Sequence, residues 1–270
     1  MTVRLLVSDV DGTLVDKDKK LTDATIAAVD RLRDAGIGFT VISARPKSGI
    51  MPILDALKLD VPVAAFNGGF VFTRDGRELF HETIDPEVAR GALALAEGLA
   101  VDIWVFADDR WHASTIGGTH VEHERIASNQ EPIVRTEFAD LGDRADKITF
   151  VSDAPQVLKD LHARIDRAHG GKATVAQSQT YYLDITALAA NKGDGIGKLA
   201  EAAGVSLRDT AAIGDQSNDL PMLTRVALSI VMGNAPDEMR KGQAHVTRGN
   251  DRDGVAHAID TMILEKEERQ

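Results

Sequence analysis

The stretch VRLLVSDVDGTLVD, residues 3–16, joins the pattern of a buried strand to two acids. Residues 3–7 form an apolar run typical of a strand, and Asp9 and Asp11 stand where that strand should end. Two carboxylates close together raise each other's pKa unless a cation or a proton intervenes. Gly12 follows and indicates a turn, because glycine adopts backbone conformations that other residues avoid. The paired acids therefore require an explanation from the rest of the chain.

The segments that follow this stretch alternate between helix and strand patterns. Residues 21–36 carry apolar side chains on one helical face between a Thr22 cap and a glycine stop, and residues 39–43 are a continuous apolar run. A helix near residues 50–57 and a strand at residues 61–66 continue the alternation. Strands that are apolar on both faces and alternate with helices predict a parallel, doubly wound sheet.

The middle of the chain has a different pattern. A hairpin at residues 101–115 and strands at 147–152 and 173–186 favour an antiparallel sheet, with helical segments at 86–100 and 155–169 between them.

From about residue 188 the alternation of helices and strands returns. We therefore expect an α/β fold whose doubly wound, parallel-sheet (Rossmann-like) core is discontinuous, formed by residues 1–83 and 188–270. Residues 84–187 would form an inserted α/β domain that contains an antiparallel sheet.

The composition excludes several kinds of chemistry. The chain has 270 residues, no cysteine, a formal net charge of −11 and 43% hydrophobic residues. Without cysteine, disulfides, thiolate metal sites and cysteine nucleophiles are excluded. The negative charge argues against binding to nucleic acid or to an anionic membrane, and no segment has the roughly 20 apolar residues that span a bilayer. Because the beginning of the chain lacks signal-peptide features, we expect a cytoplasmic protein.

Polar residues gather directly after the expected core strands, which is where ligands bind in parallel α/β sheets. In chain order these residues are Asp9 and Asp11, then Ser43 and Arg45, then Asn67-Gly68-Gly69, and finally Asp215, Asn218 and Asp219. An all-oxygen set of acids without a neighbouring histidine suits a hard divalent ion, Mg²⁺ above all. A single aspartate of this kind can instead cap a turn or a helix, but the repeated arrangement favours a ligand site.

Lys192 is a second kind of signal. It stands at the expected beginning of a helix in LAANKGDGIGKL, residues 188–199. The helix dipole disfavours a cation there by about 0.3–1 kcal/mol, so an anion such as phosphate would stabilise the arrangement. A solvated lysine ahead of a helix that begins later is the alternative. With Asp9 as nucleophile and Asp11 passing protons to the leaving oxygen, the parts together describe phosphoryl transfer.

Four motifs in chain order resemble those of the haloacid dehalogenase superfamily of phosphatases. They are DVDGT at residues 9–13, Ser43 after a buried strand, NKG at 191–193 and GDQSND at 214–219. Four further segments resemble the Cof-type branch of that superfamily, in which a large α/β cap is inserted between the second and third motifs. These segments are NGG at 67–69, YYLDIT at 181–186, GNAPDEMRK at 233–241 and DRDGVAHAI at 251–259.

The resemblance implies roles for the acids and the lysine. Asp9 would be the nucleophile and a metal ligand, and Asp11 the general acid/base, binding metal through its backbone carbonyl. Asp215 would be the third protein ligand of Mg²⁺. Asp219 would orient ligands, phosphate or metal-bound water, and Lys192 would hold the transferring phosphoryl group.

The resemblance also implies roles for residues that contact the phosphate or the substrate. Ser43 would hold the phosphoryl group with its hydroxyl, and Asn218 would orient ligands in the way proposed for Asp219. Gly12 and Thr13 would shape and fix the phosphate loop, and Asn67 would face the substrate. Ala44 stands where many relatives have glycine and restricts the backbone beside Arg45, which is the remaining expected substrate contact.

Two other charged segments are expected to have no role in the chemistry. THVEHER, residues 119–125, misses the known metal-site spacings and is expected to be a solvated helix face. The stretch around Asp16 and Asp18, with its lysines, is expected to be an exposed loop.

The sequence thus predicts a Mg²⁺-dependent phosphatase that hydrolyses small, sugar-phosphate-like metabolites through a phosphoaspartyl intermediate. A phosphomutase or phosphotransferase with the same intermediate is one alternative, and a noncatalytic module that only accepts phosphate on Asp9 is another. A dehalogenase would leave Asp11, Lys192 and the acidic metal set without a role. The physiological substrate and the oligomeric state stay open.

Overall fold

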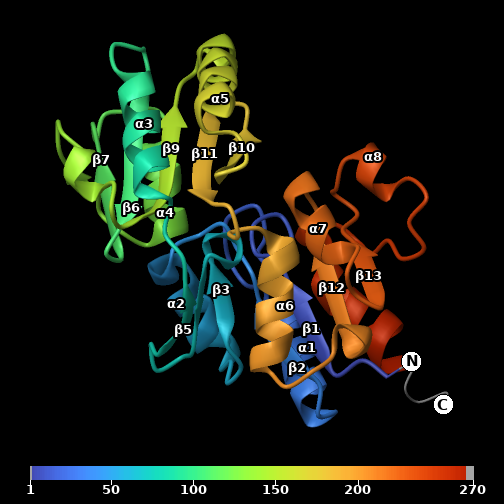
Figure 1. Cartoon of the computed structure of the whole chain (residues 1–270). Helices are drawn as coiled ribbons and strands as arrows, with labels where there is room; N and C mark the ends of the chain where they lie inside the picture. Colours follow the sequence, from blue (N-terminus) through green and yellow to red (C-terminus); the bar gives the residue numbers. More distant parts are fainter. Residues whose placement is uncertain (1, 266–270) are drawn as a thin grey trace.

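The computed structural model describes residues 2–265, which form two layers, one on a parallel sheet and one on a largely antiparallel sheet (Figure 1). The core sheet has four parallel strands in the order β13-β12-β1-β2. Its strands are β1 (Leu5–Ser8), β2 (Gly38–Val41), β12 (Thr210–Gly214) and β13 (Leu228–Val231). Because β1 and β12 pair in parallel, with Ser8 opposite Ile213, the segments that follow them leave the sheet side by side.

Helices cover both faces of the core sheet, as expected for a doubly wound fold (Figure 1). One face carries α1 (Asp23–Asp34), α2 (Lys47–Leu57), α9 (Gly254–Ala258) and the π-helix η6 (Ile259–Leu264), and the other carries α6 (Lys192–Ala202) and α7 (Leu220–Leu223). Alternate residues of β1 point to opposite faces, so that Leu6 packs with the first group and Leu5 and Val7 with the second. The predicted core architecture is confirmed.

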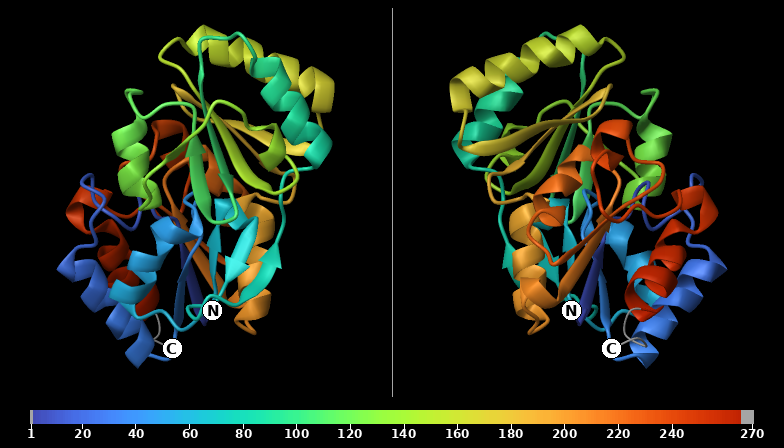
Figure 2. Two further views of the ribbon diagram at one scale, coloured as in Figure 1. Left: turned by 90° about the vertical axis from the view of Figure 1, so that its left-hand side faces the viewer. Right: turned by 90° about the vertical axis from the view of Figure 1, so that its right-hand side faces the viewer.

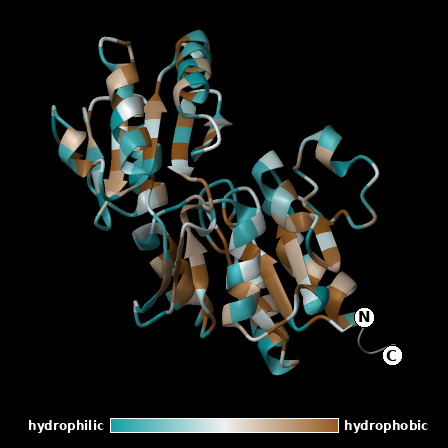
Figure 3. Ribbon diagram, viewed as in Figure 1, coloured by the Kyte–Doolittle hydropathy of each residue, from teal (hydrophilic) through white to brown (hydrophobic). Residues whose placement is uncertain are grey.

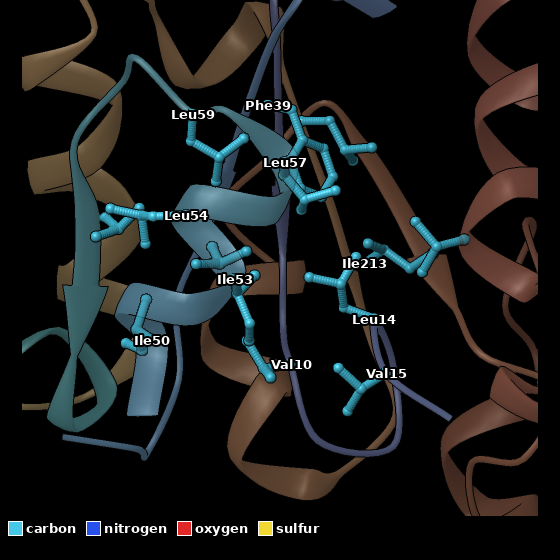
Figure 4. Packing of buried hydrophobic residues seen from close by; sticks show 14 of the residues in the cluster. Val10, Leu14, Val15, Phe39, Ile50, Ile53, Leu54, Leu57, Leu59 and Ile213 are labelled. Atoms are coloured by element: carbon cyan, nitrogen blue, oxygen red, sulfur yellow. The ribbon is translucent and has the colours of Figure 1, made fainter. Parts of the chain in front are cut away.

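The first helix begins as the sequence predicts. The hydroxyl of Thr22 accepts a hydrogen bond from the backbone N–H of Thr25, which caps α1. Figure 4 shows how the next helix is anchored, with Ile53 and Leu57 of α2 packed in one cluster with Val10 and Phe39. These apolar contacts hold the helices against the sheet, and Figure 3 shows the hydrophobic residues concentrated on the core strands.

A three-stranded antiparallel meander continues the core sheet at its edge. It consists of β3 (Val63–Ala65), β4 (Phe70–Phe72) and β5 (Glu78–His81), and a parallel bridge between Ile42 and Ala64 joins β3 to the strand that precedes it. The tight turn η1 (Phe66–Gly68) connects β3 to β4. Asn67 in this turn has a left-handed backbone conformation with φ of 56°.

The second layer is a six-stranded sheet, which we call the cap sheet, in the order β10-β11-β9-β6-β7-β8. Its strands are β6 (Asp102–Ala107), β7 (Arg110–Ala113), β8 (Ile133–Val134), β9 (Ala145–Val151), β10 (Ala173–Gln179) and β11 (Tyr182–Ala187). All neighbouring strands are antiparallel except the short β7–β8 pair, so the sheet is mixed at that edge. Helices α3 (Pro86–Ala96) and α5 (Pro155–His169) cover one face.

The other face of the cap sheet is turned toward the core (Figure 2). Trp104, Phe106 and Trp111 on that face belong to the same buried cluster as the residues of the core, and the rings of Phe66 and Phe106 lie 6.0 Å apart. The two layers therefore share one buried hydrophobic cluster, while each also has a cluster of its own. The remaining short elements are α4 (Val121–Ser128), α8 (Asp237–Arg240), η2 (Ala139–Leu141), η3 (Leu207–Asp209), η4 (Ser217–Asp219) and η5 (Asn250–Arg252).

Helix α4 connects the cap sheet to the core, where it lies above α2 (Figure 1). The hydroxyl of Ser48 donates to the carbonyl of Ser128 over 2.6 Å, and the side chain of Gln130 donates to Ser48 Oγ over 2.7 Å. A Cβ atom at Gly49 would overlap with the carbonyl oxygen of Ala127, so only glycine permits this approach of the two helices.

The expectation of a solvated face at residues 119–125 is wrong for part of that segment. Val121 and Glu124 are buried, at 2% and 7% exposure, because α4 is held between the cap sheet and α2. A row of charged residues normally indicates a solvated surface, but the sequence does not reveal a second layer that covers it. Within residues 2–265, every helix is too short or too polar to be a membrane-spanning segment.

Candidate active site

Three buried aspartates meet at the carboxyl ends of β1 and β12. Asp9 follows β1, and its backbone N–H donates to the carbonyl of Ile213 over 3.0 Å. Asp215 follows β12, and Asp219 ends the short turn η4. One carboxylate oxygen from each aspartate lies within 4.8 Å of the others. This grouping arises because parallel strands bring their carboxyl ends to one edge of the sheet.

Lys192 lies inside this group of acids. It is the first residue of α6, directly after the Asn191 cap, and it is only 2% exposed. Its ammonium donates to the carboxylates of Asp9 and Asp219, the latter over 2.6 Å. A solvated lysine is therefore excluded. The anions that offset the unfavourable helix dipole here are two carboxylates of the protein itself.

Burial and mutual repulsion shift the proton affinities of this group. Burial raises the pKa of Asp9 to about 8, a shift that Lys192 opposes and that Asp219 and Asp215 reinforce. Burial lowers the pKa of Lys192, but the facing carboxylates of Asp219 and Asp9 outweigh it and raise that pKa overall. Burial also raises the pKa of Asp215. Three acids facing one ammonium thus favour an added positive charge, either a proton on Asp9 or a divalent cation.

Both oxygens of the Asp215 carboxylate are held in place. The hydroxyl of Thr13 donates to Oδ1 over 2.9 Å, and the side-chain amide of Gln216 donates to Oδ2 over 2.9 Å. Gly12 allows this approach, because its φ is +86° and a Cβ atom there would lie 2.5 Å from Asp215 Oδ2. Gly12 and Thr13 thus position an acid of the site, in addition to any contact with phosphate.

Asp219 is held by the backbone as well as by Lys192. Its Oδ2 accepts hydrogen bonds from the backbone N–H groups of Asp215 and Gln216, over 2.8 and 2.9 Å. The side chain is fully buried. Asp219 therefore ties the loop after β12 to the ammonium of Lys192.

Asp11 is separated from the other acids by its partners. Arg45 donates two hydrogen bonds to its carboxylate, from Nε over 2.7 Å and from Nη2 over 2.8 Å. Lys19 Nζ donates a third over 2.7 Å. Burial would raise the pKa of Asp11, but the hydrogen bonds and charges of Arg45 and Lys19 hold it well below its ordinary range. Asp11 is thus an anion in this arrangement, and the partial exposure of its side chain, 32%, also favours that form.

These contacts change the interpretation of two basic residues. Arg45, expected to contact the substrate, is buried and engages Asp11. Lys19 lies in the stretch expected to be an exposed loop, yet its side chain is only 23% exposed and reaches Asp11. That expectation is wrong for Lys19, because its side chain turns to the acid and pairs with it.

The remaining predicted residues lie around the ends of the neighbouring strands. Ser43 follows β2 and is buried, with its Oγ accepting a hydrogen bond from the backbone N–H of Arg45 over 3.1 Å. The backbone N–H of Asn67 donates to the carbonyl of Ser43 over 2.7 Å. Within the described part of the chain, the side-chain Oδ1 of Asn67 is enclosed and has no hydrogen-bond partner. Asn218 is exposed beside Asp219.

A family model for haloacid dehalogenase-like hydrolases matches residues 6–259. The chain belongs to this family. The resemblance to the Cof-type branch is thereby confirmed, and the protein is a phosphatase of the haloacid dehalogenase superfamily.

Individual relatives of this haloacid dehalogenase-like hydrolase match over most of their length. It is 30% identical to an HMP-PP phosphatase of Escherichia fergusonii, covering 90% of this chain and 89% of that one. It is 26% identical to the 5-amino-6-(5-phospho-D-ribitylamino)uracil phosphatase YwtE of Bacillus subtilis, covering 97% and 98%. The crystal structure of a haloacid dehalogenase-like hydrolase from Bacteroides thetaiotaomicron has the same fold, with a TM-score of 0.88, 24% identity and coverage of 97% and 100%.

One further residue of this haloacid dehalogenase-like hydrolase was not predicted to belong to the site. Asn234 follows β13, and its amide donates to the backbone carbonyl of Gly12 over 2.8 Å and to Asp215 Oδ2 over 3.4 Å. Its Oδ1 accepts from the backbone N–H of Asn250 over 3.0 Å. The sequence carried a signal for it, because Asn234 stands in GNAPDEMRK directly after a core strand, as the other site residues do.

Proposed function

We propose that this hydrolase is a Mg²⁺-dependent phosphomonoesterase that works through a phosphoaspartyl intermediate on Asp9. The observation that carries the proposal is the buried ammonium of Lys192, which touches both Asp9 and Asp219 at the point where two parallel core strands end. A nucleophilic carboxylate needs a nearby positive charge, and so does the phosphoryl group that it attacks.

The acids of the site fit a magnesium ion. Asp9 and Asp215 supply carboxylate oxygens at mutual distances within 4.8 Å, and all the donors are oxygen, as Mg²⁺ prefers. The backbone carbonyl of Asp11 is the third ligand that we propose. Asp219, whose oxygens already accept from Lys192 and two backbone N–H groups, is better suited to orient the others than to bind the ion directly. A bound Mg²⁺ would neutralise charge on the phosphoryl oxygens.

The residues divide the chemistry between them. Asp9 attacks phosphorus with a carboxylate oxygen while the bond to the leaving oxygen breaks. Asp11 gives a proton to that oxygen and later takes one from the water that hydrolyses the phosphoaspartate. Lys192 and the hydroxyl of Ser43 hold the phosphoryl oxygens. Because Arg45 and Lys19 favour the anionic form of Asp11, their contacts must loosen before Asp11 can act as an acid.

The proposed substrates are small phosphorylated metabolites, with sugar phosphates as the expected members. The relatives named as an HMP-PP phosphatase and as a phosphoribitylaminouracil phosphatase support this class, since each name describes a small phosphorylated compound. We propose further that residues 1–83 and 188–270 are the catalytic core and that residues 84–187 are a cap over it. A cap closed over the site would exclude bulk water during phosphoryl transfer. Product analysis with an added alcohol acceptor distinguishes hydrolysis from transfer to an alcohol.

The test is Asp9→Asn with p-nitrophenyl phosphate as the substrate, with and without Mg²⁺. We expect turnover to fall by about 10⁴-fold or more, because the substitution removes the nucleophile and keeps the shape of the side chain. Asp34→Asn, an exposed position on α1, is the control and should retain full activity. Full Mg²⁺-dependent turnover by Asp9→Asn would refute the mechanism.

A second measurement separates the phosphatase from a noncatalytic phosphate acceptor. Mass spectrometry of acid-quenched enzyme should detect phosphate on the peptide that contains Asp9, and this species should decay as fast as turnover. A phosphoenzyme that forms and persists for minutes without turnover would favour the acceptor module instead.

A further inference from the structure

A segment from the C-terminal part of the chain runs beside the end of β13. The backbone N–H of Thr247 donates to the carbonyl of Val231 over 2.9 Å, and the backbone N–H of Gly233 donates to the carbonyl of Arg248 over 3.0 Å. These hydrogen bonds continue the pairing of the chain beyond the last residue of β13. Asn234 follows Gly233 and therefore lies against the turn η5, which comes directly after this segment.

The side-chain amide of Asn234 is held in one orientation by its neighbours. Its Oδ1 accepts a hydrogen bond from the backbone N–H of Asn250 over 3.0 Å. The side-chain amide of Asn250 in turn donates to the carbonyl of Val15 over 2.9 Å, which anchors η5 to the loop after β1. An amide carries its acceptor on one side and its two donors on the other. The NH₂ group of Asn234 therefore faces the loops that carry the acids of the site.

Each of the two donors of this NH₂ group has an acceptor. One donates to the backbone carbonyl of Gly12 over 2.8 Å, and the other to Asp215 Oδ2 over 3.4 Å, which is the longer and weaker contact. Gly12 follows β1 and Asp215 follows β12, and these two strands and β13 are neighbours in the core sheet. A single side chain after β13 thus connects the loops after all three strands.

The contact with Gly12 restrains a flexible point in the loop after β1. Gly12 has a φ of +86° and no side chain, so its backbone can rotate more freely than that of other residues. The carbonyl of Gly12 comes one residue after that of Asp11, the proposed backbone ligand of Mg²⁺. A hydrogen bond to the Gly12 carbonyl therefore limits the rotation that would move the Asp11 carbonyl relative to the hydroxyl of Thr13.

The contact with Asp215 acts on the proposed carboxylate ligand itself. The hydroxyl of Thr13 donates to Oδ1 of this carboxylate, and the amides of Gln216 and Asn234 both donate to Oδ2. Side chains that form hydrogen bonds to a metal ligand orient that ligand and change the affinity for the metal, although they do not touch the ion. Asn234 restrains both ligand-bearing loops at once.

We propose that Asn234 is a positioning residue for the metal ion, and that its amide, oriented by Asn250, raises the affinity of the site for Mg²⁺. This inference rests on the proposed Mg²⁺-dependent function. Without the amide, the Asp11 carbonyl and the Asp215 carboxylate would have to be ordered when the ion binds, and the cost of that ordering would reduce the affinity. If Asn234 only tied η5 to the sheet, its loss would lower the stability of the metal-free protein and leave the affinity for Mg²⁺ unchanged.

Isothermal titration calorimetry of the full chain with Mg²⁺ alone measures this affinity without turnover. Asn234→Ala should raise the Kd for Mg²⁺ by about 10- to 100-fold, the usual range when a hydrogen-bonding partner of a metal ligand is lost. Asn250→Ala releases η5 from the carbonyl of Val15 but keeps the backbone N–H, so it should raise the Kd by a smaller factor. The Mg²⁺ concentration that gives half-maximal hydrolysis of p-nitrophenyl phosphate should rise by the same factors.

The matched control removes an exposed amide on the cap. Gln156→Ala on α5, where the side chain pairs only with Asp160, should leave the Kd for Mg²⁺ unchanged. A wild-type Kd in Asn234→Ala would overturn the positioning role, whether or not the variant unfolds at lower urea in the presence of a chelator. If Asn234→Ala does not fold, Asn250→Ala decides, and an unchanged Kd in that variant would overturn the role.

The wild-type protein separates this inference from the proposed function. Binding of Mg²⁺ without hydrolysis of p-nitrophenyl phosphate would overturn the phosphatase, and the Kd of Asn234→Ala would still decide the positioning role. Mg²⁺-dependent hydrolysis with an unchanged Kd in Asn234→Ala would overturn the positioning role and leave the phosphatase standing. A wild-type protein that binds no Mg²⁺ would overturn both.

Discussion

Lys192 is the residue on which the charge balance of the site depends. Its ammonium is the positive charge that the described structure places between the buried carboxylates of Asp9 and Asp219. Breaking a buried ion pair by removing one partner typically costs about 3–5 kcal/mol, since the other partner is left uncompensated. The buried charges of the site therefore affect both the stability of the fold and its ability to bind an anion or a cation.

Lys192→Met should lower the free energy of unfolding by about 3 kcal/mol in metal-free buffer, because two carboxylates stay buried without their cation. Urea denaturation with a chelator present measures the loss. Lys172→Met, which removes an exposed lysine, should change the free energy by no more than about 0.5 kcal/mol. An unchanged midpoint for Lys192→Met would mean that the ammonium contributes nothing to folding.

The positions of the site residues after the core strands could be predicted from the sequence, but their hydrogen-bond partners could not. The rule that ligands gather at the carboxyl ends of parallel strands was enough to select Asp9 and Asp215 from the sequence, and the unfavourable position of a cation at a helix beginning selected Lys192. The same rule could have selected Asn234 after β13. The rule could not predict that Arg45 donates two hydrogen bonds to Asp11. That contact depends on how the loop after the second strand packs against the loop after the first.

At the scale of elements, we expect the contact between β5 of the core and β9 of the cap sheet to depend on pH. His81 Nε2 lies 2.5 Å from Asp146 Oδ1, and Asp146 is 5% exposed. The hydrogen bond that His81 donates to Asp146 raises the pKa of His81 against the effect of burial, with Glu78 adding to it. Burial raises the pKa of Asp146, which the hydrogen bond to His81 opposes.

Both pKa values, of His81 and of Asp146, are raised, so both groups contribute more to stability at low pH than at high pH. A group whose pKa is raised by folding stabilises the folded state below its unfolded pKa, about 6.5 for histidine, and loses that contribution as the pH rises through the folded value. The difference in free energy of unfolding between wild type and His81→Gln should therefore be larger near about pH 5.5 than near about pH 8.5.

Denaturation in urea across this pH range measures the difference for His81→Gln. The same substitution made in an Asp146→Asn background should show little dependence on pH, because the charged acceptor is gone. A wild-type difference that is constant, or that grows with rising pH, would contradict the proposed ion pair.

Helix α4 marks the limit of sequence analysis at this scale. Its charges predicted a solvated face, but Glu124 is buried because α4 is held between the cap sheet and α2, where Lys147 of β9 lies 3.8 Å from the Glu124 carboxylate. Residues so far apart in the chain are matched by the docking of two layers, and nothing in the local pattern of either segment indicates the match. Helix α1 was predictable from periodicity and from its Thr22 cap, whereas the strands β4 and β5 were not among the predicted elements.

At the scale of the whole molecule, an inserted layer was predictable from the change of pattern along the chain, but its close union with the core was not. Phe66 follows a core strand and Phe106 lies on a cap strand, yet both belong to one buried cluster. Proteins with two separable domains commonly unfold in two steps. A shared core predicts a single step here.

Both tryptophans, Trp104 and Trp111, lie in cap strands on the face turned toward the core, so their fluorescence reports on the cap and on its junction with the core. In urea, the fluorescence transition of the wild type should coincide with the far-ultraviolet circular dichroism transition of the whole chain. Phe66→Ala should cost about 3–5 kcal/mol and move the fluorescence transition to lower urea than the dichroism transition, because it removes the core side of the junction. Phe39→Ala, a buried core residue away from the cap strands, should shift both transitions together. Separate transitions in the wild type would show that the cap and the core do not unfold together. Coincident transitions in Phe66→Ala would show that the aromatic junction does not couple them.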